Sequence, residues 1–431
     1  MMKKRKINIV IVGLGNIGIY LYKYLKKNKK ILSKKNNCIP EVIFVSAKNK
    51  KKKRDVKIPN NKWLKNYLDA TKMKNVDVIV ELIGGAEGPA KKLVFTALRN
   101  KKHVVTANKA LIAKYGNQLS SIAERNKVNL EFEASVCGGV PIIRSIKEGL
   151  IANKINKVYG IFNGTSNYIL STMDKENRNF SDALQSAKNL GYAESNPASD
   201  LNGDDVGAKL QILSSLCFNT FINKTIHIEG IKGIDKIDID NANKLNYKIK
   251  LLAFAEIMNN KIYQRVHPTL IKKSSYIASI DGVLNAVIIE GKPVGQSVIQ
   301  GEGAGPEATT SALVSDLSSI SRGNIKFPFS ISLKERKKLK FGSIFDKNSS
   351  AYLRFDVIDK PGVLSNITKI FAQNKVSIKR LIQNPNKIKE NSSIIIITHQ
   401  SKDFSINKII SQVSKKNYMV KKPKLIRIGV N

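Results

Sequence analysis

The sequence predicts an α/β protein whose first part is a doubly wound parallel sheet. Short apolar runs rich in β-branched residues alternate there with helical segments, the order expected of parallel strands joined by helices. The middle of the chain has longer helices and more scattered strands, which is typical of an α+β domain. The last part indicates a small βαββαβ unit of its own.

The first domain is expected to span residues 1–140. Continuous apolar runs indicate strands buried on both faces, and they cover residues 7–12, 42–47, 76–84 and 103–108. Helices are predicted over residues 19–27, 61–68, 89–100 and 110–127. A helix near residues 305–322 is expected to complete this domain.

Three further segments follow along the chain. A second domain is expected over residues 141–304, and residues 323–349 are charged and loop-like, as in a linker. Residues 350–431 form the predicted βαββαβ unit, in which an amphipathic helix follows the turn at 359–364.

The bulk composition excludes some classes of protein. No run of about 18 apolar residues is present, so no membrane span is expected. The basic N-terminus lacks the small-residue cleavage site of a signal peptide and is interpreted as leading into a first strand. The three cysteines, Cys38, Cys137 and Cys217, have neither metal-ligand nor disulfide spacing, which favours a reducing cytoplasm.

The chain carries a formal net charge of +41. The lysines are spread along its whole length beside many Asn and Ile, which favours a compositional drift toward A/T-rich codons. A polyanionic partner is the alternative, but no nucleic-acid recognition module or aromatic-interleaved basic stripe is present. We therefore expect no nucleic-acid partner, although such a field would attract an anionic substrate or cofactor.

A glycine pattern follows the first predicted strand directly. Gly13, Gly15 and Gly18 have the G-x-G-x-x-G spacing, with Leu14, Asn16 and Ile17 between them. The first glycine permits a tight turn, the second lets a pyrophosphate approach the backbone, and the third lets helix and strand pack closely. The helix N-terminus supplies N–H donors for phosphates. The pattern predicts a Rossmann-type dinucleotide site, against the alternative of a tight turn without a ligand.

The end of the second strand bears on the choice of dinucleotide. Folds that select NAD usually carry a carboxylate there for the ribose hydroxyls. This chain has Ser46, Ala47 and Lys48 at that place, and its first acidic residue is Asp55. A lysine would attract a 2′-phosphate, so NADP is favoured and NAD remains the alternative.

Carboxylates gather in the segment GYAESNPASDLNGDDVGAKL, residues 191–210. Asp205 and Lys209 are spaced i, i+4 on a predicted helix, and a surface salt bridge is the ordinary interpretation of such a pair. Glu194 and Asp200 lie in the loop before that helix. Because clustered carboxylates repel one another without a cation, the segment predicts a pocket for an ammonium group, such as that of an amino acid.

Hydride transfer at a carbon bearing oxygen needs a group that moves a proton at that oxygen. The histidines, His103, His227, His267 and His399, lack a catalytic neighbourhood and are expected to be structural. A lysine beside carboxylates can move the proton instead, which favours Lys209. Lys109 is the second well-placed lysine, because it follows the fourth strand and ligands bind at the carboxyl ends of such strands.

With these motifs the chain resembles homoserine dehydrogenases that carry a C-terminal ACT domain and no attached kinase. The likeness covers essentially the whole length and includes GLGNIG, ELIGG, TANKAL, EASVCGGVPI, NGTSNYIL, GYAESNPASDLNGDDVGAKL and GEGAGPEAT. The resemblance implies reversible conversion of L-homoserine to L-aspartate 4-semialdehyde with NAD(P), on the route to threonine and methionine.

The resemblance also implies residue roles. Lys209 matches the proton donor, Asp205 the carboxylate that works with it, and Glu194 the residue holding the substrate amino group. Other positions that match the substrate pocket are Asp200, Tyr192, Gly164 and Thr165. Thr106 and Lys109 match residues beside the nicotinamide, and Gly303 matches a loop that closes over the cofactor.

Three further features are implied by the resemblance alone. Glu133 and the backbone oxygens of Val136, Gly138 and Val140 match a monovalent cation site, usually sodium. The ACT-like unit implies an amino-acid effector such as threonine, although relatives differ in this response. A homodimer or homotetramer is also expected.

Two rival functions are weighed against this one. A semialdehyde dehydrogenase would use Cys137 as a nucleophile, but no histidine stands near it in sequence and a buried small hydrophobe is favoured. A sensor without catalysis would pair the dinucleotide fold with the ACT unit, but it would not need the acidic pocket with Lys209.

Overall fold

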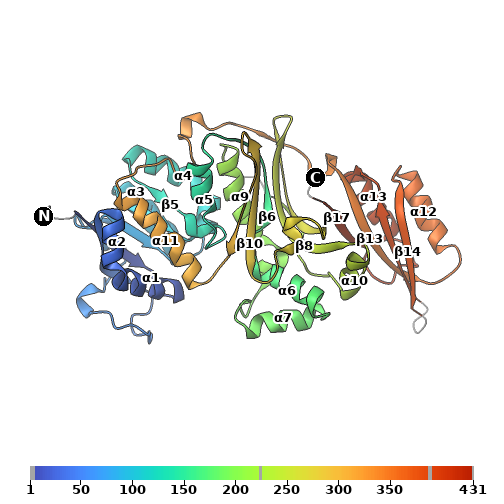
Figure 1. Ribbon diagram of the computed structural model, residues 1–431, viewed down its shortest axis with the longest axis horizontal. Helices are drawn as coiled ribbons and strands as arrows, with labels where there is room; N and C mark the ends of the chain where they lie inside the picture. Colours follow the sequence, from blue (N-terminus) through green and yellow to red (C-terminus); the bar gives the residue numbers. More distant parts are fainter. Residues whose placement is uncertain (1–4, 223–225, 387–390, 430–431) are drawn as a thin grey trace. The chain divides into compact units, whose positions relative to one another are not determined.

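The computed structural model describes residues 5–222, 226–386 and 391–429, which divide into two compact units (Figure 1). The first unit combines Met1–Val158, Ala208–Thr225 and Leu284–Leu339, and the second combines Tyr159–Gly207, Ile226–Val283 and Lys340–Asn431. The chain passes from one unit to the other within strand β6 (Lys154–Ile161) and within helix α9 (Asp204–Cys217).

The first unit contains the predicted parallel sheet. Its strands run in the order β2-β1-β3-β4-β5, and each neighbouring pair is parallel. Their bounds are β1 Arg5–Val12, β2 Cys38–Ser46, β3 Val78–Glu81, β4 His103–Thr106 and β5 Leu130–Glu131. Strand β1 lies between β2 and β3, and Ile9 pairs with Val42 on one side and Val78 on the other. The doubly wound fold is thus confirmed.

Helices of the first unit pack against this sheet and its connecting segments. They are α1 Asn16–Lys27, α2 Lys29–Asn36, α3 Pro89–Arg99, α4 Lys109–Asn126, α5 Ile142–Arg144 and α11 Pro306–Ser321. Ile9, Ile11 and Leu21 share a fully buried cluster with Leu313 and Leu317 of α11. A helix from late in the chain therefore packs into the core of the N-terminal sheet. The antiparallel pair β10 (Leu284–Lys292) and β11 (Gly295–Glu302) also belongs to this unit.

The helix predicted over residues 61–68 is wrong. The segment has only a 3₁₀ turn at Asn60–Lys62. Leu64 N–H donates to the carbonyl of Val45, and Trp63 bridges to Val45 as well, so the backbone serves strand β2 rather than a helix. Helix α2 was not predicted, because its sequence KKILSKKN buries only Leu32 and Asn36 and has no apolar period.

The second unit contains helices before, within and after the acidic segment, and a long hairpin. The helices are α6 Gly164–Lys175, α7 Phe180–Asn189, α8 Ala198–Asn202 and α10 Lys236–Lys244, and the hairpin joins β8 (Tyr247–Met258) to β9 (Lys261–Lys272). Figure 1 shows α6 and α7 close together, in agreement with their packing. Helix α9 starts in this unit at Asp204.

The C-terminal βαββαβ unit is confirmed and extends the hairpin. Its elements are β13 Asn348–Ile358, α12 Val363–Gln373, β14 Ile378–Asn386, β15 Asn391–Thr398, α13 Asp403–Val413 and β17 Lys424–Ile428. The strand order β8-β9-β17-β13-β15-β14 places β17 beside β9. Leu353 and Phe355 of β13 pack against Ile367 and Phe371 of α12 in a buried core. Within the described residues, no helix has the length and apolar composition needed to cross a membrane.

Candidate active site

The glycine turn after β1 requires two of its glycines for packing. Gly13 has φ +107, and a Cβ there would lie 2.3 Å from the carbonyl oxygen of Leu82. A Cβ on Gly18 would lie 2.1 Å from the carbonyl oxygen of Gly13. Both separations are far below van der Waals contact, so the tight turn and the close approach of helix to turn need glycine at these positions.

Gly15 differs from Gly13 and Gly18, because a Cβ there would meet no atom within 4 Å. It is the N-cap of α1, and no side chain caps the backbone N–H groups of this helix end. Leu14 is buried, Asn16 is exposed and Ile17 is half-buried. The open space at a helix N-terminus is what a pyrophosphate requires.

The loop after β2 is folded back onto the glycine turn by Arg54, which the sequence interpretation missed. Its guanidinium donates to the carbonyls of Asn49 (2.8 Å), Lys50 (3.1 Å) and Lys52 (2.8 Å). Its Nε donates to the carbonyl of Leu14 at 3.4 Å. Lys48 is exposed at the start of this loop. These bonds from the Arg54 side chain to backbone carbonyls hold the basic loop, residues 48–54, in place beside the predicted dinucleotide site.

The carboxyl ends of β3 and β4 are tied together by a buried polar network. Thr106 donates its hydroxyl to Glu81 at 2.5 Å, and the other carboxylate oxygen of Glu81 accepts from the N–H of Ile83 and Gly84. Asn108 caps α4 by accepting from Leu111 N–H at 3.1 Å and donates to the carbonyl of Gly85. The network fixes the backbone just before Lys109, which is half-buried at the first position of α4.

Glu81 and Asn108 were not predicted as site residues. Glu81 is a fully buried carboxylate in an apolar strand, and such a residue almost always has a specific partner. The sequence shows this acidic residue directly after an apolar run, as the first residue of ELIGG.

Gly138 and Gly303 pack against each other in the first unit. Gly138 has φ +37, and a Cβ there would lie 2.7 Å from the carbonyl oxygen of Gly303. A Cβ on Gly303 would lie 2.2 Å from the side chain of Asn285. Asn285 is fully buried, and its amide has no hydrogen-bond partner among the described residues. The junction of these glycines therefore leaves a buried polar group unsatisfied.

Glu133 is buried and accepts from the N–H of Ile143 (2.8 Å) and Arg144 (2.7 Å) at the start of α5. Burial raises its pKa to about 7, against the opposing effect of those two N–H groups. The carbonyl of Val140 accepts from Ile142 N–H. No three His, Cys, Asp or Glu side chains of the described ranges are grouped so as to hold a metal.

Asn163 brings two of the predicted carboxylates together in the second unit. Its Nδ2 donates to Asp200 at 2.7 Å and to Asp205 at 3.0 Å, one hydrogen to each. Its Oδ1 caps α6 by accepting from Ser166 N–H at 2.8 Å. A single amide thus fixes both carboxylates and the start of the helix that carries Gly164 and Thr165. Asn163 was not predicted, although an Asn before a helical run is an ordinary N-cap.

Thr165 and Tyr192 also meet, because the Thr165 hydroxyl donates to the carbonyl of Tyr192 at 2.6 Å. The Tyr192 ring contacts Tyr168 at 5.0 Å between centroids and remains partly exposed. Gly164 is needed for packing, since a Cβ there would lie 2.7 Å from the carbonyl oxygen of Val283. These contacts hold the start of the acidic segment against α6.

Helix α9 carries Asp205 in its first turn and Lys209 one turn later, so both lie on one face. Both residues are buried, each 8% exposed, which differs from an ordinary surface salt bridge. Glu194 lies exposed in the loop between α7 and α8. In the second unit Asn163 therefore joins Asp200 to Asp205, and Thr165 bonds to Tyr192.

The histidines and cysteines occupy ordinary structural positions. His103 accepts from Asn129 N–H, His227 pairs with Glu229, and His267 is buried against Thr269, where desolvation keeps its pKa well below the usual value. All three cysteines are buried, and Cys137 is only 1% exposed. A buried thiol does not suit the rival nucleophile.

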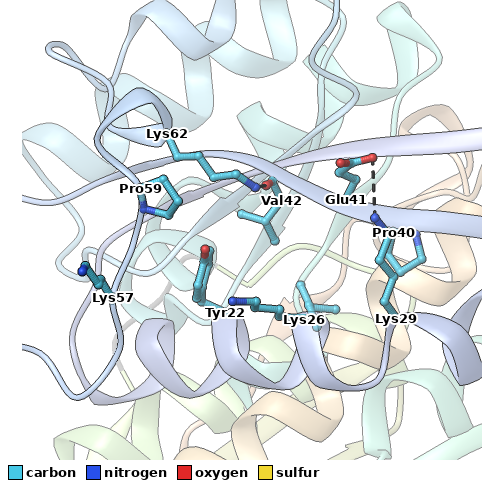
Figure 2. A pocket seen from close by; sticks show the side chains of 10 residues that line it. Tyr22, Lys26, Lys29, Pro40, Glu41, Val42, Lys57, Pro59 and Lys62 are labelled. Atoms are coloured by element: carbon cyan, nitrogen blue, oxygen red, sulfur yellow. Dashed lines mark hydrogen bonds and ion pairs between the residues drawn. The ribbon is translucent and has the colours of Figure 1, made fainter.

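A cavity of about 220 Å³ lies between α1 and the first half of β2, and Figure 2 shows side chains that line it. Lys62 donates there to the carbonyl of Val42, and Lys29 pairs with Glu41. Because β2 pairs in parallel with β1, Pro40–Val42 lie toward the amino ends of the strands. Dinucleotides bind beyond the carboxyl ends, so this cavity is not the cofactor site.

Three sequence models of known families match the chain. "Homoserine dehydrogenase, NAD binding domain" matches residues 13–133, "Homoserine dehydrogenase" matches 141–318, and "AHAS small subunit-like ACT domain" matches 353–421. Together they span the glycine turn, the acidic segment and the C-terminal unit.

Relatives that match the chain over almost its whole length agree with these family models. The chain is 37% identical to a homoserine dehydrogenase of Neisseria gonorrhoeae, over 98% of this chain and 99% of that one. It is 36% identical to that of Helicobacter pylori, over 99% of each. The crystal structure of a homoserine dehydrogenase from Thiobacillus denitrificans superposes with a TM-score of 0.90 at 36% identity, covering 99% of this chain and 98% of that one. The chain belongs to the homoserine dehydrogenase family.

Proposed function

We propose that this chain interconverts L-homoserine and L-aspartate 4-semialdehyde with Lys209 and Asp205 as its proton-transfer residues. The observation that carries this assignment is the Asn163 amide, which holds Asp200 and Asp205 together on the approach to Lys209. The bound nicotinamide supplies or accepts the hydride at the carbon bearing oxygen.

Lys209 moves the proton at the substrate oxygen in this proposal. A buried amine is well suited to that step, because water does not compete for its proton. Asp205, one turn earlier and fixed by Asn163, orients and electrostatically supports the amine. The carboxylates of Glu194 and Asp200 would bind the substrate ammonium group, with Gly164, Thr165 and Tyr192 shaping the pocket.

Replacing Asn163 with alanine tests whether its bonds to Asp200 and Asp205 matter for catalysis. The two carboxylates lose their shared donor, and we expect kcat/KM for L-homoserine to fall about 10- to 100-fold, as for hydrogen bonds to charged groups. The matched control is Asn126→Ala, which removes an amide that donates to the backbone carbonyl of Leu98 rather than to a carboxylate. Steady-state kinetics at saturating NADP distinguish the two. Equal losses in both variants would show that Asn163 has no special role.

We propose NADP as the preferred cofactor. Gly13, Leu14, Gly15, Asn16, Ile17 and Gly18 would form the pyrophosphate turn, and Thr106, Lys109 and Gly303 would lie near the nicotinamide. The basic loop that Arg54 holds against Leu14 supports NADP, because it begins with Lys48 where NAD-selective folds have a carboxylate. NAD is the alternative cofactor.

Lys48→Glu tests this preference. The substitution removes an attraction for the 2′-phosphate and adds a repulsion, so kcat/KM with NADPH should fall about 10- to 100-fold while NADH is used as well as before or better. Lys53→Glu changes the net charge equally and is the control. A wild-type enzyme that uses NADH better than NADPH would contradict the proposal directly.

We also propose a monovalent cation, sodium, held by Glu133 with the backbone oxygens of Val136, Gly138 and Val140. One carboxylate with neutral oxygens suits a hard monovalent ion. The unsatisfied amide of Asn285, beside Gly303 and Gly138, is a further polar group at the same junction. Thermal stability that is identical in sodium and choline salts would exclude the site.

The assembly proposed is a homodimer or homotetramer. Among the described strands β11 pairs with β10 alone, and its side chains alternate between exposed and half-buried. Such an edge commonly pairs or packs with a second copy. A monomer in sedimentation equilibrium at micromolar concentration would contradict this proposal.

The ACT-like unit supports an amino-acid effector, and we propose threonine as the first candidate. The βαββαβ core is complete, and its glycine turn has Gly362 at φ +87 before α12.

A further inference from the structure

Helix α9 contains a buried glycine, Gly207, on the side away from the two proposed proton-transfer residues. Gly207 is two residues after Asp205 and two before Lys209, so it lies about 200° around the helix axis from each of them. Glycine is unfavourable inside a helix, because it loses more backbone freedom on folding than any other residue. Its presence in the second turn of α9 therefore needs a packing reason.

The packing reason is Ile228 of the short strand β7 (His227–Ile228). A Cβ on Gly207 would lie 2.5 Å from Ile228 Cδ1, and a Cβ on Gly203 would lie 3.0 Å from Ile228 Cγ2. Ile228 is held beside Val266, because β7 pairs in parallel with β9. One side chain of the second unit thus lies directly against the backbone where α9 begins.

Gly230 and Ile231 contact the end of α8 in the same way. A Cβ on Gly230 would lie 2.1 Å from the carbonyl oxygen of Leu201, and Ile231 N–H donates to that oxygen at 2.9 Å. Leu201 directly follows Asp200. The segment 228–231 therefore contacts the acidic segment next to Asp200 as well as along the first turns of α9.

Glu229 anchors the segment 228–231 through its carboxylate. Its Oε1 accepts from Arg427 Nη1 at 2.8 Å and lies 2.7 Å from His227 Nε2. Arg427 is itself fixed, since it is only 1% exposed and donates its Nε to Asp403 at 2.8 Å. Burial acts to raise the pKa of Glu229, but the hydrogen bond with His227 and the charge of Arg427 lower it to about 2. The ionised carboxylate therefore makes a charge-assisted bond to a buried guanidinium.

We propose that Ile228 and Glu229 are positioning residues for the proton-transfer step. Ile228 sets where the first turns of α9 lie, and Glu229, anchored to Arg427, holds Ile228 there. Both act through the helix that carries Asp205 and Lys209 rather than on the substrate. The inference rests on the proposed function, because it assigns the support of that same site.

Gly207→Ala in the full chain tests the contact. The new methyl group meets Ile228 Cδ1, so the helix must move, and a small displacement of a reacting group lowers the rate steeply. We expect kcat for L-homoserine to fall about 10- to 100-fold, while KM for NADP stays close to its wild-type value because the turn at 13–18 is unaltered. The control is Gly149→Ala, whose Cβ enters open space at an exposed position and should leave kcat unchanged.

Ile228→Val provides a rescue that a merely structural role would not give. Valine lacks the Cδ1 atom that the new methyl group meets, and Cγ1 would lie 3.5 Å from it. The double variant Gly207→Ala/Ile228→Val should therefore recover kcat to within about threefold of Ile228→Val alone. A general loss of stability would not be repaired by removing a further methyl group from the packing.

Glu229→Gln tests the anchor. The amide keeps the shape of the side chain but loses the charge that pairs with Arg427, so kcat should fall about fivefold or more. The matched control is Glu41→Gln, because the Glu41 side chain is 30% exposed against 32% for Glu229 and also pairs with a cation, Lys29. The control should retain wild-type kcat, and thermal melts confirm that both variants are folded.

The outcomes separate this role from the proposed function. A wild-type kcat in Gly207→Ala, or a double variant as slow as Gly207→Ala, would overturn the positioning role of Ile228. Equal kcat in Glu229→Gln and Glu41→Gln would overturn that of Glu229. In either case a loss of turnover in Lys209→Ala would leave the proton-transfer assignment standing. Loss and rescue at Gly207 beside an active Lys209→Ala would instead support the positioning role and show that another group moves the proton.

Discussion

Lys209→Ala is expected to abolish turnover of L-homoserine while cofactor binding survives. The amine lies one helical turn after Asp205 on a buried face of α9, and no other lysine occurs in that helix. Loss of a general acid–base group costs roughly a hundred- to ten-thousandfold in kcat. The measurement is kcat in both directions, together with a fluorescence titration of NADPH.

Two further variants sharpen this result. Lys209→Arg retains the positive charge but cannot give up its proton near neutral pH, so it should be as inactive as the alanine variant. Asp205→Asn should lower kcat with the fold intact, because Asn163 can still bond to its side-chain oxygen. Near-wild-type kcat in Lys209→Ala would show that another group moves the proton.

Gly13→Ala is expected to destabilise the first unit by roughly 3 kcal/mol or more. The new Cβ would lie 2.3 Å from a backbone oxygen at a φ of +107, so the turn must change shape. Thermal unfolding monitors the loss, and dinucleotide binding should disappear with it.

Gly15→Ala is the matched control for that result. Its Cβ would enter open space, so Tm should stay close to the wild-type value. The methyl group would occupy the space that a pyrophosphate needs, so KM for NADPH should rise about tenfold or more. If Gly15→Ala binds NADPH normally, the turn does not approach the phosphates as proposed.

Local sequence patterns predicted most of the fold. The strand and helix order of the first domain, the glycine turn and the βαββαβ unit depend on periodicity and turn residues that lie close together in sequence. The helix predicted at 61–68 failed because Leu64 and Trp63 bond to Val45, a partner about 20 residues away that local propensity cannot reveal.

The site residues also divide into those that local sequence predicts and those that depend on distant partners. Asp205 and Lys209 were predictable, since their spacing and the surrounding helix are local. Asn163, Glu81 and Arg54 act through partners 25 to 42 residues away. Their roles appear only when the chain is folded, although a buried acid in a strand and an Asn before a helix were usable indications.

The most direct test of the account is a crystal structure of the chain with L-homoserine and an unreactive NADP analogue. We expect the substrate ammonium among Glu194, Asp200 and their neighbours, and its hydroxyl oxygen about 3 Å from Lys209 Nζ. A substrate bound with that hydroxyl directed away from Lys209, toward some other donor, would contradict the proton-transfer role on which the proposed mechanism depends.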